Sequence, residues 1–362
     1  SRSPMNSPVQ TVASLSPPPS PLTFPFDVPP QPGTWQAVAD GVYWLRMPLP
    51  FALDHINLWV LRDRDGWTLV DTGINTDITR ELWSQLIEHA FAGLPVRRII
   101  VTHFHPDHMG LAGWLVQRFG VELWMTEAEY LTAANVYADL PGMTRESSVQ
   151  FFALHGLDAD RQEALRQQTH SYRRAVSAPP EAFHRMQDGD VLDIDGRDWR
   201  IIVGWGHAPE HAALYCAALG TLIAGDMVLP KISTNVSVWS REPEGDPVEQ
   251  FLRSIERYAQ LPAESLILPS HGLPFHGLRQ RVAALTEHHR LRLNELAAAC
   301  EQPVSAADVL PVLFRRALDT HQISFAMGEA IAHLNHLMFK RRVVRDLDSH
   351  GVLRFHAPSS HN

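Results

Sequence analysis

The segment 101–110, with the sequence VTHFHPDHMG, constrains what this chain can fold into more than any other stretch. The β-branched residues before it predict a buried strand, and the residues after it predict the first turns of a helix over 110–119. A strand-to-helix loop lies at the carboxyl end of its strand, where open α/β sheets bind ligands. This loop holds three imidazoles and one carboxylate, on His103, His105, Asp107 and His108.

These four side chains predict a metal site. Imidazole nitrogens and a carboxylate together suit zinc, with iron or manganese as substitutes. His103 and His105 can share one ion, while Asp107 and His108 turn toward a second. The alternative interpretation is a histidine-rich surface loop. It is disfavoured because all four donors stand together between a strand and a glycine-containing helix start.

Three later segments with strand character each end in one more donor of the same kind. The donors are His207, Asp226 and His271. Isolated structural histidines would not be expected to follow strands in this way. We therefore expect these three residues to join the histidine-rich loop at one edge of the sheets.

The order of strands and helices predicts an α/β fold, an αββα sandwich of two mixed sheets with outer helices. Residues 1–33 are rich in Ser and Pro and predict a disordered tail. We expect a catalytic domain over 34–277, a connecting helix over 278–299 and a winged-helix-like module over 300–356. A helical insertion over 127–185 interrupts the catalytic domain, as a lid, a dimer surface or a simple covering hairpin.

Composition limits the setting in which the chain works. Its two cysteines, Cys216 and Cys300, give no disulfide framework and indicate a reducing compartment, so we expect a cytoplasmic protein. We expect no membrane span, because the sequence has no apolar run of about 18 residues, and no signal peptide, because the first thirty residues lack a basic stretch followed by an apolar block. The formal charge of −9 argues against nucleic acid as a partner, although a local basic patch stays open.

The ordered donor set resembles that of the metallo-β-lactamase-fold hydrolase superfamily over roughly residues 34–275. The terminal module resembles the winged-helix appendage of one branch, which is similar to glyoxalase II. The long gap between His108 and His207, which the insertion fills, departs from compact members. The resemblance implies that Asp71 orients a ligand histidine. It implies one ion on His103, His105 and His207, a second on Asp107, His108 and His271, and Asp226 as a bridge between them.

Two divalent ions, zinc in the first place, would give hydrolysis through a metal-bridging hydroxide. Asp107 would orient this hydroxide or pass a proton to the leaving atom. Flavin-linked diiron members resemble this pattern but carry glutamate at the position of His105, so the histidine favours hydrolysis. Substrate contacts are assigned to His211, Lys231 and His55. The alternatives are an outer hydrogen-bonding or capping role for His211, a solvated Lys231 and a strand-entry position for His55.

The expected substrate is a small-molecule acidic ester or thioester, with a lactone as an alternative. The alternative function is a metal-dependent ribonuclease, because ribonuclease-like members of the superfamily also carry a winged helix. A local basic patch supports this alternative and consists of Lys340, Arg341, Arg342 and Arg345. The same patch lies at a predicted helix C-terminus, where the helix dipole stabilises cations, so the patch does not require a bound phosphate. In the non-enzymatic alternative, the site is vestigial and the terminal module serves protein interaction or dimerisation. The sequence is also compatible with a homodimer.

Overall fold

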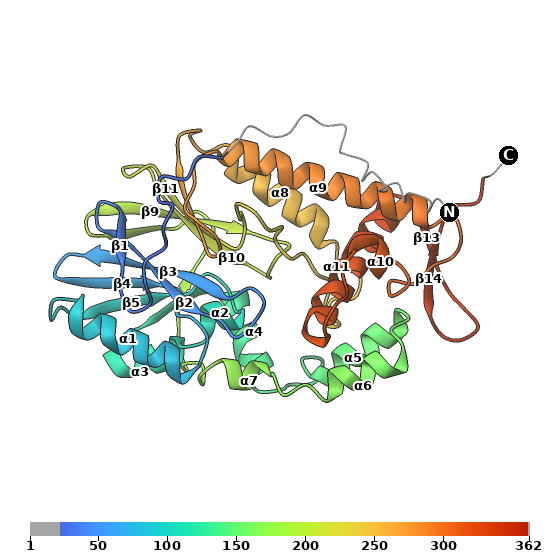
Figure 1. Ribbon diagram of the computed structural model, residues 1–362, viewed down its shortest axis with the longest axis horizontal. Helices are drawn as coiled ribbons and strands as arrows, with labels where there is room; N and C mark the ends of the chain where they lie inside the picture. The colour runs from blue at the N-terminus through green and yellow to red at the C-terminus, as the bar shows by residue number, and fades with distance from the viewer. Residues whose placement is uncertain (1–21, 361–362) are drawn as a thin grey trace, which may run out of the picture.

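The computed structural model describes residues 22–360, which form two large sheets with helices on their outer sides (Figure 1). The first sheet has seven strands in sequence order. Neighbours from β1 to β4 pair antiparallel, whereas β4 to β7 pair parallel. These strands are β1 (Gln36–Ala39), β2 (Val42–Pro48), β3 (His55–Asp63), β4 (Gly66–Val70), β5 (Val96–Ile100), β6 (Leu123–Thr126) and β7 (His184–Met186).

The second sheet has five strands in the order β12-β11-β10-β9-β8. Only the β11–β12 pair is parallel, and the other pairs are antiparallel. A separate hairpin of β13 and β14 lies near the C-terminus. The strands are β8 (Val191–Ile194), β9 (Arg197–Gly204), β10 (His211–Cys216), β11 (Thr221–Gly225), β12 (Leu266–Pro269), β13 (Val344–Leu347) and β14 (Leu353–His356).

Helices cover the outer face of each sheet. Helices α1, α3 and α4 lie on the first sheet, and α8 and α9 lie on the second (Figure 1). This arrangement confirms the predicted αββα sandwich. No helix among residues 22–360 is long and apolar enough to cross a membrane. The helices are α1 (Asp77–His89), α2 (Pro106–Met109), α3 (Ala112–Phe119), α4 (Glu127–Tyr137), α5 (Arg145–Leu154), α6 (Ala159–Arg166), α7 (Tyr172–Ala175), α8 (Pro247–Tyr258), α9 (Leu278–Ala299), α10 (Leu310–Leu313) and α11 (Thr320–Phe339).

Alternation along the strands explains why both sheets are buried on both faces. In β3, Ile56, Leu58 and Val60 pack under the outer helices, while Trp59 and Leu61 fill the core between the sheets. Successive side chains of a strand point to opposite faces, so a continuous apolar run serves two cores. The stacked sheets bring their strand ends to the same edge, which positions the site.

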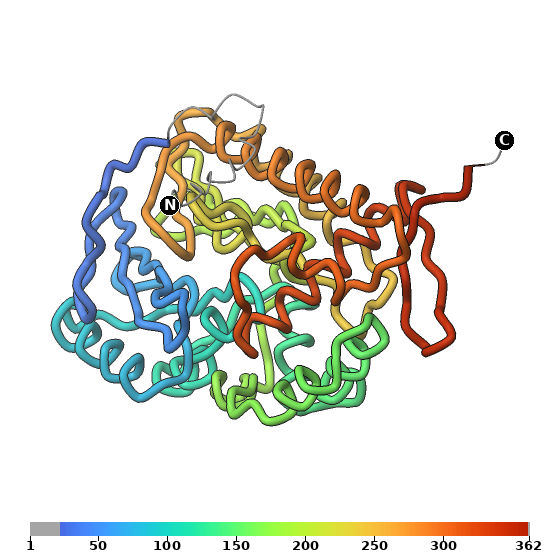
Figure 2. The backbone as a smooth tube through the Cα atoms, turned by 45° about the vertical axis from the view of Figure 1, so that its right-hand side comes forward, coloured from blue at the N-terminus to red at the C-terminus, as the bar shows by residue number. Residues whose placement is uncertain are grey.

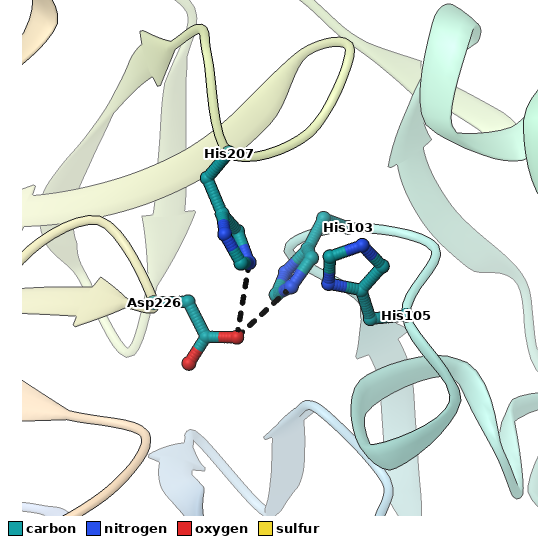
Figure 3. A group of neighbouring side chains, drawn as sticks. All are labelled: His103, His105, His207 and Asp226. Atoms are coloured by element: carbon teal, nitrogen blue, oxygen red, sulfur yellow. Dashed lines mark ion pairs between the residues drawn. The ribbon is translucent and has the colours of Figure 1, made fainter. Parts of the chain in front are cut away.

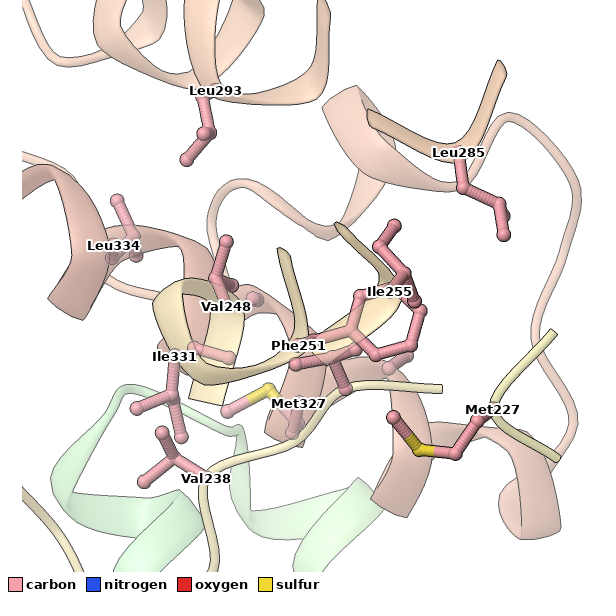
Figure 4. Packing of buried hydrophobic residues seen from close by; sticks show 14 of the residues in the cluster. Met227, Val238, Val248, Phe251, Ile255, Leu285, Leu293, Met327, Ile331 and Leu334 are labelled. Atoms are coloured by element: carbon pink, nitrogen blue, oxygen red, sulfur yellow. The ribbon is translucent and has the colours of Figure 1, made fainter. Parts of the chain in front are cut away.

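The C-terminal segment shares one hydrophobic core with the second sheet. Figure 4 shows Phe251 and Ile255 of α8 among residues of α9 and α11, such as Ile331. The predicted connecting helix, α9, is therefore packed along its length rather than spanning a gap. Helices α10 and α11 and the β13–β14 hairpin follow in the predicted order, and their likeness to a winged helix stays a prediction.

The insertion packs against the same C-terminal segment. Helices α5 and α6 lie beside the C-terminal elements, as the green and red parts of the chain show in Figure 2. Phe152 and Leu165 are buried in the core that these elements share, and the Ala307 N–H donates to the carbonyl of His155 at 3.2 Å. Part of the apolar surface of the insertion is thus covered within this chain, while Leu131, Leu140 and Leu154 are exposed, so the lid, dimer-surface and covering-hairpin interpretations all stay predictions.

The predicted disorder of the first 33 residues is partly wrong. Residues 1–21 lie outside the described part of the chain. Residues 22–33 are placed, and Thr23 forms a β-bridge with His276, with N–H···O distances of 3.3 and 2.9 Å. Leu22 and Phe24 pack on the core beneath α9. Apolar residues among the prolines therefore anchor residues 22–33 to the core. The high Ser and Pro content led to the prediction of disorder for this segment.

The shared core predicts that both parts of the chain unfold together. Ile331 is 0% exposed, so Ile331→Ala should lower the free energy of unfolding by about 2–5 kcal/mol through lost burial and a cavity. Phe339 lies on the same helix at 45% exposure, and Phe339→Ala should change that energy by less than about 0.5 kcal/mol. Urea unfolding followed by circular dichroism should show a single transition. Two separate transitions would contradict the shared core.

Candidate metal centre

The structure brings the seven predicted donors to the edge where strands of both sheets end. One correction concerns the loop itself. Asp107 and His108 lie inside α2, a short helix with Pro106 at its first position, rather than in a loop before a single helix. The chain continues into α3 only after a break at 110–111. His103 and His105 precede α2, and the other three donors follow β9, β11 and β12: His207, Asp226 and His271.

The donors form two groups that share one carboxylate. Within each group, the candidate ligand atoms all lie within 4.8 Å of one another. Figure 3 shows the first group, with the rings of His103 and His207 directed at Asp226 and the ring of His105 beside them. The first group is His103, His105, His207 and Asp226; the second is Asp107, His108, His271 and Asp226.

Asp226 is the centre of the arrangement. Its Oδ2 lies 3.2 Å from Nε2 of His103, 3.0 Å from Nε2 of His108 and 3.2 Å from Nε2 of His207. Its Oδ1 lies 3.3 Å from Nε2 of His271. Four imidazoles from three separate segments therefore direct the same nitrogen toward one buried carboxylate.

Outer hydrogen bonds hold four of these rings by their other nitrogen. Nδ1 of His207 donates to the carbonyl of Asn235 at 2.6 Å, and Nδ1 of His271 donates to the carbonyl of His55 at 2.8 Å. A carbonyl only accepts, so the proton of each neutral ring sits on Nδ1 and leaves the Nε2 lone pair facing inward. Nδ1 of His103 meets the Thr102 hydroxyl at 2.8 Å. This is how proteins orient histidine ligands.

Asp71 holds the fourth ring. Its Oδ2 accepts from Nδ1 of His108 at 2.7 Å and from the Thr102 hydroxyl at 2.9 Å, while its Oδ1 accepts the Thr102 N–H at 2.8 Å. The backbone of Asp71 has φ = 65°, in the left-handed region that aspartate tolerates better than branched residues. The side chain is thus turned into the site, at the position that the resemblance implies for an orienting partner.

The chemistry of the donors fits a cation. Nε2 of His103, Nε2 of His207 and Oδ1 of Asp226 are buried and lack a hydrogen-bond partner among the described residues. Such atoms are costly to bury without a partner. Burial lowers the pKa of His271, but Asp226 and Asp107 outweigh it and raise this pKa to about 10. The carboxylates therefore create a field that favours positive charge between the rings, and the two groups could each hold a metal ion.

A third group of possible ligands differs from these two. Asp246, Glu249 and His336 also come within 4.8 Å of one another. Each is already engaged, because Asp246 caps α8 and contacts His336 at 3.0 Å, while Glu249 pairs with Arg253 at 3.0 Å and Lys340 at 3.4 Å. These contacts account for the group without an ion.

The predicted substrate contacts lie elsewhere or support the donors. His211 is fully buried, and its Nε2 accepts the N–H of Asp226 at 3.2 Å, which is the outer hydrogen-bonding role that the sequence left open. His55 accepts the Gly272 N–H at 2.9 Å and holds the loop of His271. Because His211 is fully buried and bonded to the backbone of Asp226, its assignment to a substrate contact was wrong. Lys231 is exposed, and its role stays a prediction.

Sequence reasoning missed Glu129, which joins the two loops that carry the first group. This buried residue in the first turn of α4 accepts the N–H of Phe104 at 2.9 Å and the N–H of Glu210 at 2.7 Å. Burial raises the pKa of Glu129 to about 7, although both N–H bonds favour the ionised form. Its only sequence signal was an acidic residue early in a helix, which usually interacts with the helix dipole.

Glu329 is a second missed residue, and it comes from the C-terminal helix α11. Its Oε1 accepts from the Asn235 amide at 3.2 Å and from the Val236 N–H at 3.3 Å. Asn235 is the residue whose carbonyl holds His207. The C-terminal segment therefore helps to position a donor of the first group.

Comparisons with known proteins agree with this geometry. Residues 52–271 match the model of the metallo-beta-lactamase superfamily. The chain belongs to this superfamily. Residues 293–358 match the metallo-beta-lactamase-like C-terminal domain, so the chain is a metallo-hydrolase of the branch that carries this appendage.

Three relatives illustrate the likeness. The chain is 47% identical to a solved beta-lactamase domain protein from Burkholderia ambifaria, with a TM-score of 0.88 over 93% of this chain and 98% of the other. It is 24% identical to the probable metallo-hydrolase YqjP of Bacillus subtilis, over 82% of this chain and 92% of that protein. It is 22% identical to the human acyl-coenzyme A thioesterase MBLAC2, over 65% of this chain and 80% of that protein.

The bridging role of Glu129 predicts that Glu129→Gln weakens the site. The amide can accept only one of the two N–H bonds and presents its own donors to the other, so the free energy of unfolding should fall by about 1–3 kcal/mol. Affinity for added zinc should fall about 10- to 100-fold, as for other outer partners of ligands. Chemical unfolding and competition with a zinc chelator measure the two effects.

A matched control lies in the same turn of α4. Among residues 22–360, Glu127 pairs only with Arg185, at 3.3 Å with both side chains about half exposed, and Glu127→Gln should leave both quantities unchanged. Equal effects of the two substitutions would contradict the role of Glu129.

Proposed function

We propose that this metallo-hydrolase binds two divalent ions, zinc in the first place, and cleaves a small acidic ester or thioester. The observation that carries the proposal is the pair of donor groups joined by Asp226. Imidazole and carboxylate donors in this number suit two zinc ions, with iron or manganese as substitutes. His103, His105 and His207 would hold one ion, Asp107, His108 and His271 the other, and Asp226 both.

A bound pair of divalent ions would supply the chemistry, because it would polarise a carbonyl oxygen and lower the pKa of water from about 15.7 to near 7. The residues of the site prepare this chemistry in two ways. Asp71 and the carbonyls of Asn235 and His55 keep the ring protons on Nδ1, so the Nε2 atoms stay free to bind. Burial of the rings excludes bulk water and strengthens the electrostatic interactions inside.

Asp107 is placed to handle the proton. Its Oδ2 lies 3.3 Å from Nε2 of His271 and 3.6 Å from Nε2 of His108. Burial raises the pKa of Asp107, but the two histidines outweigh it and hold this pKa below its usual value. The side chain is 19% exposed, compared with 8% for Asp226, so an ionised carboxylate faces the open side of the site. It can accept a proton from water and pass it to the leaving group.

The cysteines offer no alternative chemistry. Cys216 and Cys300 are both free and buried, one in the core between the sheets and one in the core beneath α9. Burial raises the pKa of Cys300 to about 11, which keeps it a thiol. Activated water is therefore the nucleophile that this site supports best.

A thioester or ester is supported by the similarity to an acyl-coenzyme A thioesterase, although that relative is distant. The ribonuclease alternative loses part of its basic patch, since two of its four cations are paired: Lys340 with Glu249 at 3.4 Å and Arg345 with Glu244 at 2.8 Å. Cations that are already paired with carboxylates attract phosphates weakly. We therefore propose a small-molecule substrate in preference to RNA.

Metal removal should affect both stability and turnover. Dialysis against a strong chelator leaves buried imidazoles and carboxylates without their partner, so the midpoint of thermal unfolding should fall and added zinc should restore it. Elemental analysis should find about two ions per chain before dialysis. Fewer than one zinc, iron or manganese ion per chain would contradict the proposal.

Asp107→Asn should lower kcat about 10²- to 10⁴-fold, because an amide cannot accept the proton. The assay should present thioesters, esters, lactones and single-stranded RNA side by side to the zinc-loaded enzyme. We expect turnover of the acidic thioester or ester to exceed that of the lactone and of RNA.

The exposed carboxylate of Asp160 on α6 provides a matched control, and Asp160→Asn should leave kcat unchanged. An unchanged kcat for Asp107→Asn would remove this residue from the mechanism. Cleavage of RNA alone would replace the proposed substrate class.

A further inference from the structure

A cavity opens directly beside the first donor group. Its lining includes the donor His207 and, along the chain after Asn235, the residues Trp239 and Arg241. Gln250 of α8 lies on the same lining. The cavity therefore joins the reacting centre to one arginine, and none of its lining residues was assigned to substrate from the sequence.

The guanidinium of Arg241 is held by aromatic rings and not by acceptors. Its central carbon lies 5.7 Å from the ring centre of Phe104 and 5.9 Å from that of Trp239. Phe104 stands between His103 and His105, and its ring lies 4.7 Å from that of His105. Cation–π contacts of this kind fix the plane and position of a guanidinium while leaving its N–H groups free.

No hydrogen bond or ion pair of Arg241 is present among residues 22–360. Other partly buried arginines differ. Arg46 donates to the Gly272 carbonyl at 2.7 Å, and Arg281 donates to the Ile232 carbonyl at 2.9 Å. Burial lowers the pKa of Arg241, with Glu129 and Glu242 acting in the opposite direction. A guanidinium keeps its charge, so a sheltered one without an acceptor favours an anion in its cavity.

We propose that Arg241 binds a carboxylate of the substrate and so determines its class: half-esters or half-thioesters of dicarboxylic acids. A planar guanidinium matches a carboxylate through two parallel hydrogen bonds. Glu242 lines the same cavity, and its charge disfavours a doubly charged phosphate beside a single arginine. The scissile carbonyl lies at the donor groups near His207, and the second carboxylate lies at Arg241. The part of this inference that concerns hydrolysed substrates rests on the proposed hydrolase function.

The first test compares two thioesters of equal shape on the zinc-loaded enzyme. They are S-succinyl-N-acetylcysteamine and its neutral isostere S-(4-methylpentanoyl)-N-acetylcysteamine. The wild type should prefer the succinyl compound in kcat/KM, and Arg241→Gln should reduce this preference about 10- to 100-fold, the effect of losing a charge-assisted pair. The loss should fall mainly on KM, and the neutral compound should react as with the wild type. Arg241→Lys should retain part of the preference.

The second test needs no turnover. Thiols bind zinc directly, so 3-mercaptopropanoate and its neutral isostere 3-methylbutane-1-thiol compare the same metal contact with and without a carboxylate. Calorimetry should give tighter binding of the mercaptopropanoate to the wild type, and Arg241→Gln should abolish the difference. If neither thioester is cleaved while this preference holds, the proposed hydrolase substrate fails and the role of Arg241 stands.

Arg253→Gln is the matched control. Arg253 is 78% exposed on α8, where it pairs with Glu249 at 3.0 Å, and its loss removes the same charge without touching the cavity. This control should leave both preferences unchanged. Arg241 has no such role if the wild type shows no preference for either anionic probe, or if Arg241→Gln weakens the charged and neutral probes equally. An equal loss of the preference for the anionic probes in Arg253→Gln would also overturn the proposal, because the preference would then depend on the net charge of the protein.

Discussion

The burial of Asp226 among four imidazoles is the constraint on which the rest of the structure depends. Oδ1 of Asp226 and Nε2 of His103 and His207 have no hydrogen-bond partner among the described residues; such atoms are costly to bury, and a cation removes that cost. The cation can be shared only if each ring presents the right nitrogen, so the outer hydrogen bonds matter as much as the donors. Asp71, the carbonyl of Asn235 and the carbonyl of His55 each provide one of these bonds.

Elements outside the two sheets serve the same constraint. Glu129, at the start of the insertion, ties together the loops of His103 and His207. Glu329, on the C-terminal helix α11, braces the residue that holds His207. The insertion and the C-terminal segment also share one core. The appendage is therefore part of the support of the metal centre and not a separate module on a linker.

Local patterns made much of this predictable. The apolar runs located most of the long strands, and donors at their ends indicated the site, because strand ends of stacked sheets meet at one edge. Helix α8 was overlooked although Asp246 and Pro247 form a typical cap and first position. The roles of Glu129, Glu329 and Arg241 depend on contacts between segments distant in sequence. Nothing local distinguishes such residues from ordinary surface charges.

An anomalous diffraction map of zinc-loaded crystals, recorded on both sides of the zinc absorption edge, tests the central claim most directly. The account predicts two peaks, one within reach of His103, His105 and His207 and one within reach of Asp107, His108 and His271, with Asp226 touching both. No peak among these residues, or peaks only at other sites on the protein, would contradict it.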